Sequence, residues 1–183
     1  MKRKRYNLFS EHLKELFGHR IHKISVDAGF SCPNRGGSRN LPGCLFCDPG
    51  GSGAVGIDRG FPVAEQIERG KEVMVRKYKA GQFLAYFQPF SNTFAPVSRL
   101  RRLYDEALSV PDVVGLAVGT RPDCLPEEVL DLLAERAPGS GACGFASTSS
   151  SVSPGKAGST SSPLPRRWPG CGWTASRSTS FTC

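Results

Sequence analysis

Residues 83–87 read Phe83-Leu84-Ala85-Tyr86-Phe87, an apolar run without a charged side chain. A continuous run of this length is typical of a strand that is buried on both faces, as in a parallel sheet. A second run, Val-Val-Gly-Leu-Ala-Val, occupies residues 113–118, and residues 21–26 (Ile-His-Lys-Ile-Ser-Val) alternate between apolar and polar side chains. We therefore expect three strands over these ranges.

Amphipathic segments follow each predicted strand. Helical spacing of apolar residues is seen over 62–79, 97–108 and 126–136, and a shorter helix over 6–18 precedes the first strand, with Ser10 as its N-cap and Gly18 as its stop. This strand–helix order predicts an α/β fold with a parallel sheet and right-handed crossovers. Chemistry in such folds gathers in the loops after the strands, here the cysteine loop (residues 27–51), residues 88–93 and residues 119–123.

The composition changes after about residue 137. From Arg136 to Cys183 there is no Asp or Glu, and Ser, Thr, Gly and Pro dominate. We therefore divide the chain into an ordered part, residues 1–137, and a low-complexity tail, residues 138–183, which we expect to be irregular or disordered. A shifted reading frame is a second explanation, because GC-rich codons read one nucleotide back would encode a helix, a turn and a strand start. The nucleotide sequence of this segment distinguishes the two.

The net charge and the absence of targeting signals indicate where the protein is located and which partners it can bind. The first thirty residues contain no apolar signal-peptide core, and no stretch is long enough to span a membrane. We therefore expect a cytoplasmic protein with reduced thiols, in which clustered cysteines indicate metal binding or catalysis. The net charge of +8 is compatible with a nucleic-acid partner, and equally with a solvated basic tail and helix face.

Three of the seven cysteines lie in the loop after the first strand, as Cys32-x11-Cys44-x2-Cys47. Three thiolates can bind three of the four irons of a [4Fe-4S] cluster, whereas a fourth thiolate would occupy the last iron. The iron without a cysteine ligand is free to bind another molecule, which indicates an enzyme. The alternative is a structural zinc site in which Cys44 and Cys47 are completed by Cys32 and Cys124 or a histidine. Such a protein would be a zinc-binding, nucleic-acid-associated module.

Several spaced motifs resemble one branch of a known superfamily. Residues 5 to about 134 resemble the YhcC/YtqA-like group of radical S-adenosylmethionine proteins, which is related to the Elp3-like branch. The matching stretches are Val26–Arg35, Gly43–Cys47, Ala85–Gln88, Asn92–Pro96 and Val114–Pro126. The resemblance implies the first half of a partial (β/α)6 barrel, about three β/α units. It also implies reductive cleavage of S-adenosylmethionine to a 5′-deoxyadenosyl radical.

The resemblance also assigns site residues and partners. Cys32, Cys44 and Cys47 would ligate the [4Fe-4S] cluster, and Phe46 would pack against the cluster or the adenine. Cofactor contacts are expected after the second and third strands, at Gln88, Ser91, Asn92, Thr93, Thr120, Arg121 and Asp123. Implied partners are S-adenosylmethionine and an electron donor such as flavodoxin or ferredoxin, with RNA as a candidate substrate.

The resemblance stops near residues 134–136. We therefore expect a C-terminally truncated or frameshifted chain that is impaired in catalysis. Its third strand would then be an unpaired edge of the sheet.

Overall fold

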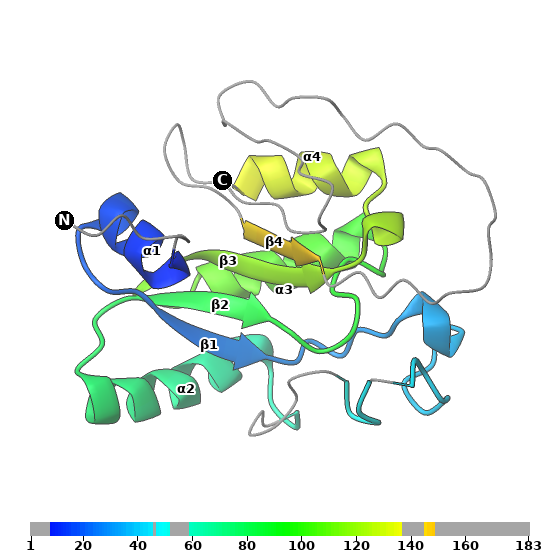
Figure 1. The fold of residues 1–183 in the computed structure, drawn as a ribbon, viewed down its shortest axis with the longest axis horizontal. Helices are drawn as coiled ribbons and strands as arrows, with labels where there is room; N and C mark the ends of the chain where they lie inside the picture. The colour runs from blue at the N-terminus through cyan, green and yellow to red at the C-terminus, as the bar shows by residue number, and fades with distance from the viewer. Residues whose placement is uncertain (1–7, 46, 52–58, 137–144, 149–183) are drawn as a thin grey trace.

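Four parallel strands form one sheet in the computed structural model, which describes residues 8–45, 47–51, 59–136 and 145–148. The strands stand side by side in chain order (Figure 1): β1 (His22–Val26), β2 (Phe83–Phe87), β3 (Val113–Thr120) and β4 (Phe145–Thr148). Every pairing is parallel. The predicted α/β class and the first three strands are therefore confirmed, while a (β/α)6 partial barrel stays a prediction.

The helices lie close to their predicted ranges: α1 (Phe9–Phe17), α2 (Val63–Tyr78), α3 (Val97–Leu108) and α4 (Glu127–Arg136). Two short 3-10 turns, η1 (Pro33–Arg35) and η2 (Pro122–Cys124), follow β1 and β3. Gly18 ends α1 as predicted, in a left-handed conformation (φ 75°) that glycine adopts without steric cost. The predicted N-cap is wrong: Leu8 occupies that position, and Ser10 lies inside the helix.

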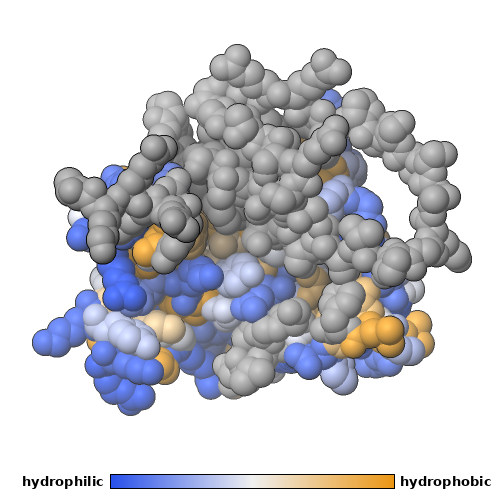
Figure 2. All heavy atoms as spheres, viewed as in Figure 1, coloured by the Kyte–Doolittle hydropathy of each residue, from blue (hydrophilic) through white to orange (hydrophobic). Residues whose placement is uncertain are grey.

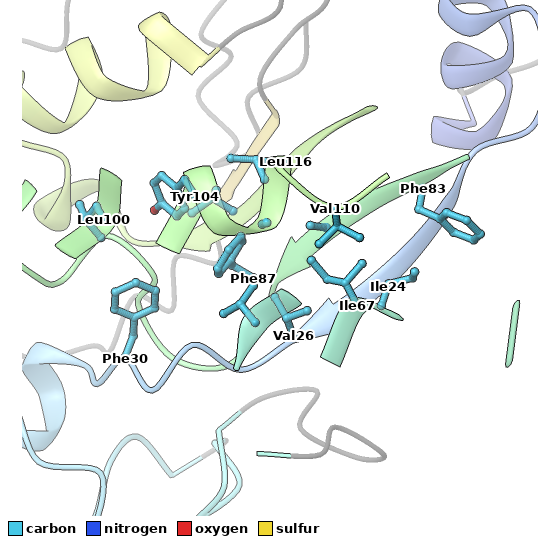
Figure 3. Close-up of a cluster of buried hydrophobic side chains, with 14 of the residues drawn as sticks. Ile24, Val26, Phe30, Ile67, Phe83, Phe87, Leu100, Tyr104, Val110 and Leu116 are labelled. Carbon is cyan, nitrogen blue, oxygen red and sulfur yellow. The ribbon is translucent and has the colours of Figure 1, made fainter. Parts of the chain in front are cut away.

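The main core lies between one face of the sheet and helices α2, α3 and α4 (Figure 3). Alternate side chains of the strands face it, and Phe83, Ala85 and Phe87 of β2 are all at most 1% exposed. The opposite face is covered at the start of the strands by α1, where Leu13 packs against Ile21 and Leu84. This double burial explains why residues 83–87 carry no charge.

Strand β4 corrects the expectation of an irregular tail and an unpaired third strand. Residues 145–148 fall in the segment predicted to be irregular, yet they pair in register with Ala117–Thr120 of β3. The stretch Phe145-Ala146-Ser147-Thr148 is too short to show an alternating strand pattern, and the neighbouring edge of β3 supplies the pairing. The rest of the predicted tail lies outside the described residues.

The register brings the ends of the strands to one edge. Val26 stands beside Phe87, and Phe87 beside Val118, so the chain leaves β1, β2 and β3 at the same edge of the sheet. The loops predicted to carry function begin there. No helix in the part of the chain that the structure describes is both long and apolar enough to cross a membrane.

Candidate functional site

The three predicted loops meet at the carboxyl edge of the sheet, as their positions after parallel strands predict. The backbone N–H of Ser91 donates to Ser31 O in the cysteine loop (3.1 Å), and Asn92 N–H donates to Gly119 O at the end of β3 (3.0 Å). Ser25 Oγ donates to Gln88 Oε1 across β1 and β2 (3.0 Å). The loop after β2 therefore joins the other two.

Each sulfur of the cysteine loop lies beside one side-chain hydrogen-bond donor. Asn34 Nδ2 is 2.9 Å from Cys44 Sγ, and Ser91 Oγ is 3.4 Å from Cys32 Sγ. Arg35 Nη2 is 3.8 Å from Cys47 Sγ. All three cysteines are half-buried and free of disulfides. Hydrogen bonds to ligand sulfurs are one of the means by which proteins orient and tune cysteine ligands.

The cysteine turn is compact, but the sulfurs are not gathered around one point. Cys47 N–H donates to Cys44 O (3.0 Å), which closes the turn between them. Within the described ranges, no three His, Cys, Asp or Glu side chains lie close enough together to hold one metal ion. The three predicted cysteine ligands therefore lie in one loop as free thiols, but their sulfurs are not arranged to hold one metal ion together.

The surface of this loop is open and partly apolar. Figure 2 shows hydrophobic atoms gathered over the region where Figure 1 draws the cysteine loop. Leu41 and Leu45 are among the exposed large hydrophobic residues of the described chain. The turn that carries Cys44 and Cys47 is therefore accessible from outside. Phe46, predicted to pack against a cofactor, lies outside the described residues.

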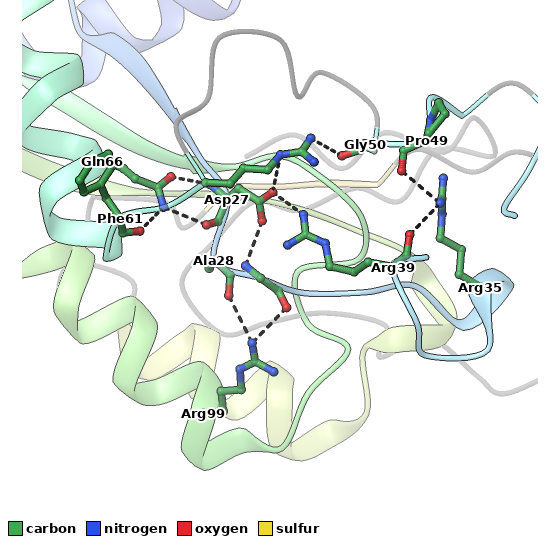
Figure 4. A network of polar contacts seen from close by, with 11 residues as sticks. Asp27, Ala28, Arg35, Arg39, Pro49, Gly50, Phe61, Gln66 and Arg99 are labelled. Carbon is green, nitrogen blue, oxygen red and sulfur yellow. Dashed lines mark hydrogen bonds and ion pairs between the residues drawn. The ribbon is translucent and has the colours of Figure 1, made fainter. Parts of the chain in front are cut away.

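Arg35 organises the loop from within. Its side chain is buried, and its guanidinium donates to four backbone carbonyls, those of Arg39, Leu41, Asp48 and Pro49 (Figure 4 draws two of these residues). A Cβ on Gly43 would lie 2.7 Å from Arg35 Nε, so a larger residue at this position would displace the Arg35 side chain. In the sequence, Arg35 stands out only as the last residue of the Val26–Arg35 motif.

Asp27 forms a second centre, at the end of β1 (Figure 4). Its buried carboxylate pairs with Arg39 and with Arg59, whose Nε is 3.2 Å from Oδ2. Its backbone is held by Gln66 of α2, which accepts from Asp27 N–H (2.9 Å) and donates to Asp27 O (3.0 Å). Asp27 therefore links the end of β1 to Arg39 inside the cysteine loop, to Arg59 beyond that loop, and to helix α2. No sequence pattern marks this network, because α2 is amphipathic and Gln66 is one of its many polar residues.

Phe90 packs under the loop from the neighbouring segment. Its φ of 67° is unusual for a bulky residue, and its ring lies 5.2 Å from the guanidinium of Arg35 and 4.5 Å from that of Arg39. A Cβ on Gly51 would lie 2.9 Å from this ring. Strained backbone of this kind persists where packing determines it, and it is common at functional sites. Sequence reasoning missed this residue because a lone Phe after a strand carries no such signal.

The residues predicted after β2 divide into accessible and buried ones. Gln88 is half-buried, whereas Ser91, Asn92 and Thr93 are at most 3% exposed. Asn92 Nδ2 donates to Phe87 O (3.0 Å) and Gly119 O (2.8 Å), and Thr93 Oγ1 bonds to Thr120 Oγ1 and Cys124 O. These bonds hold the ends of β2 and β3 together. Within the described chain, Asn92 Oδ1 and Ser31 Oγ are buried without a hydrogen-bond partner.

The residues predicted after β3 form a charged pair beside a buried thiol. Arg121 donates two hydrogen bonds to Asp123 (2.8 and 2.7 Å), which lowers the pKa of Asp123 and raises that of Arg121. Burial, reinforced by the charge of Asp123, raises the pKa of Cys124 to about 11. Cys124 is thus a buried thiol near the site, and Thr120 is buried against Thr93.

These features define a parallel α/β protein that presents a cysteine-rich loop, cross-linked by arginines, at the carboxyl edge of its sheet. No protein-family model and no solved structure matches the chain. YtqA of Bacillus subtilis (strain 168) is 46% identical over 132 residues, which cover 72% of this chain and 41% of YtqA. YhcC of Escherichia coli (strain K12) is 43% identical over 129 residues, 70% of this chain and 40% of YhcC.

An archaeal protein is similar over the same length. MJ0486 of Methanocaldococcus jannaschii is 39% identical over 127 residues, 68% of this chain and 38% of that protein. The chain therefore spans about two fifths of the length of these curated relatives. Their names state no activity, so the similarity supports a shared fold without assigning a reaction.

Proposed function

We propose that this chain is a radical S-adenosylmethionine protein and binds a [4Fe-4S] cluster through Cys32, Cys44 and Cys47. The observation that carries the proposal is the matching of one side-chain donor to each of the three sulfurs. All three cysteines stand at the carboxyl edge of a parallel sheet, where α/β proteins bind cofactors.

The residues present fit such a cluster by their chemistry. Thiolates are the usual cluster ligands, and hydrogen bonds to sulfur tune both ligand and cluster. The described sulfurs are not close enough together to share an ion, so cluster binding has to draw them together, as metal binding commonly does when it is coupled to folding. Reductive cleavage of S-adenosylmethionine is the chemistry that a bound three-cysteine cluster supplies in this superfamily.

The buried and accessible residues after β2 and β3 have separate roles in this proposal. Asn92, Thr93 and Thr120 fix the relative positions of the loops through bonds within the protein. Gln88, Arg121 and Asp123 remain partly exposed and can contact a small molecule at this edge. The proposal includes three partners: S-adenosylmethionine, an electron donor such as flavodoxin or ferredoxin, and RNA as a substrate.

Anaerobic reconstitution with iron and sulfide tests the proposal. We expect the unmodified chain to acquire a brown, oxygen-sensitive chromophore with about four irons per chain, as a [4Fe-4S] cluster requires. Cys44→Ala removes one of three ligands and should abolish iron uptake. Cys124→Ala is the matched control, because Cys124 is a buried thiol of the same edge outside the ligand set, and it should retain the cluster.

A zinc site gives the opposite pattern. Stoichiometric zinc with no iron, lost in both Cys44→Ala and Cys124→Ala, would assign the loop to a structural zinc module and overturn the cluster proposal.

A further inference from the structure

Arg35 is a buried charged residue in the same loop as the three proposed cluster ligands, although it is not a ligand itself. Only 5% of it is exposed. Nη1 donates to Arg39 O (3.3 Å), Leu41 O (3.0 Å) and Pro49 O (3.2 Å), and Nη2 donates to Asp48 O (2.8 Å). Two of these carbonyls precede Cys44 and two follow Cys47 in the sequence, so one guanidinium joins the two arms of the cysteine loop.

The positive charge of Arg35 lacks a carboxylate partner in the described part of the chain. Its neighbour Arg39 shows the ordinary arrangement, because it is paired with Asp27. A buried charge is costly unless an anion or well-placed dipoles compensate for it. The four carbonyls supply dipoles, and Cys47 Sγ, 3.8 Å from Nη2, is a further acceptor.

The guanidinium is fixed in this place by its surroundings. The ring of Phe90 lies 5.2 Å from its central carbon, and Gly43 approaches Nε so closely that a Cβ there would be at 2.7 Å. The fork of N–H groups on arginine suits several acceptors in one plane, which the single ammonium of lysine cannot reproduce.

We propose that Arg35 is a positioning residue for the cluster: it holds the two arms of the cysteine loop together and directs one N–H at the sulfur of Cys47. This inference rests on the proposed function and deepens it. An N–H donor and a positive charge beside a ligand sulfur stabilise the more negative, reduced form of a cluster, so Arg35 would raise the reduction potential of a cluster bound here. Removing a residue that orients a ligand weakens metal retention by about ten- to hundred-fold.

The test compares Arg35→Gln and Arg35→Lys with Arg99→Gln in the full 183-residue chain. Arg99 is a matched control, since it donates to two carbonyls of the same loop, Ala28 O (3.3 Å) and Gly29 O (3.1 Å), but to no sulfur. Three properties are measured: hydrogen exchange of the Cys47 and Gly51 amides in the apo chain, the rate of cluster loss to a chelator, and the midpoint potential by redox titration.

We expect Arg35→Gln to speed amide exchange, to speed cluster loss about ten- to hundred-fold, and to lower the potential. Arg35→Lys keeps the positive charge, so its midpoint potential should be close to that of the unmodified chain. Its amide exchange and its cluster loss should stay as fast as in Arg35→Gln. Arg99→Gln should leave all three near those of the unmodified chain.

The possible failures are distinguishable. Equal exchange and equal cluster loss in Arg35→Gln and Arg99→Gln would overturn the inference while leaving the cluster itself in place. Faster exchange and faster loss at an unchanged potential would overturn the donation to Cys47 and leave a purely structural role. If the unmodified chain takes up no iron, the proposed function fails together with the role of Arg35 toward a cluster, and the apo exchange data decide whether Arg35 holds the loop.

Discussion

At the residue scale, buried polar side chains hold the carboxyl edge together. Asp27 and Arg35 differ in charge but act alike, since each gathers backbone or side-chain groups from several points of the loop region. Asn92 does the same between β2 and β3, with its amide nitrogen donating to Phe87 O and Gly119 O. An alternative use of Asn92 as a direct cofactor contact would have to break these bonds or use its unpartnered Oδ1.

Asn92→Ala should therefore destabilise the fold. The substitution removes the side-chain donor from Phe87 O and from Gly119 O, although Gly119 O keeps the backbone N–H of residue 92. The loss of a buried hydrogen bond that leaves a group unsatisfied costs about 1–3 kcal/mol. We expect a loss of about 2 kcal/mol or more in the free energy of unfolding, measured by urea denaturation of the apo chain. Ser109→Ala is the control, because Ser109 Oγ makes one exposed hydrogen bond, to Glu106 O, and a change below about 0.5 kcal/mol is expected there. Equal stability of the two variants would argue against a structural role for Asn92.

At the element scale, helices α2 and α3 are held against the sheet by close packing, and ion pairs add little. Exposed pairs such as Arg136 with Asp105, which lowers the pKa of Asp105, link α4 to α3. Pairs of this kind contribute at most about 1 kcal/mol. The approach of α2 to β1 is tighter, because Gly70 lies directly over Ile24: a Cβ added to Gly70 would be 2.4 Å from Ile24 Cγ2.

Gly70→Ala should destabilise the chain despite the better helix propensity of alanine. Propensity alone would stabilise α2 by about 1 kcal/mol. Overpacking against a core residue that is 4% exposed costs about 1–3 kcal/mol, and a 2.4 Å contact lies at the severe end. We expect a net loss of about 1–2 kcal/mol in urea denaturation. Gly81→Ala adds the same methyl where nothing lies within 4 Å, and its stability should be almost unchanged. A Gly70→Ala chain more stable than Gly81→Ala would contradict this packing.

At the scale of the whole molecule, β4 changes how the sheet ends. It covers Ala117–Thr120 of β3, the half of that strand nearest the candidate site, although it belongs to a segment without sequence signals for a strand. An exposed parallel edge is a template for association with another chain. The short strand therefore protects the edge at which the three loops meet.

Deleting residues 137–183 should promote self-association. The deletion removes β4 and exposes the backbone of Ala117–Thr120. A chain that lacks only residues 149–183 keeps β4 and serves as the control. We expect the larger deletion to raise light scattering and the apparent mass in size-exclusion chromatography at equal concentration. Identical behaviour of the two deletions would mean that β4 does not protect the sheet edge.

Local sequence patterns identify most of the framework of this protein. Helices and strands with a strong apolar period, such as residues 83–87 and 97–108, match the structure to the residue because each pattern is set by neighbours in the sequence. Their order fixes the parallel sheet, and parallel strands bring the loops with Cys32, Gln88 and Thr120 to one edge. The sequence by itself therefore determined the class of fold and the location of the candidate site.

Only the tertiary structure decided which side chains at that edge are free to act. The family resemblance assigns Asn92, Thr93 and Thr120 as cofactor contacts by their place in the loops, and the structure shows that all three are buried in hydrogen bonds between loops. Arg35 and Phe90 carry no sequence signal for their roles, and β4 exists through pairing with β3. The physical reason is that burial, hydrogen-bond partners and edge pairing depend on segments far apart in the chain, which no local pattern records.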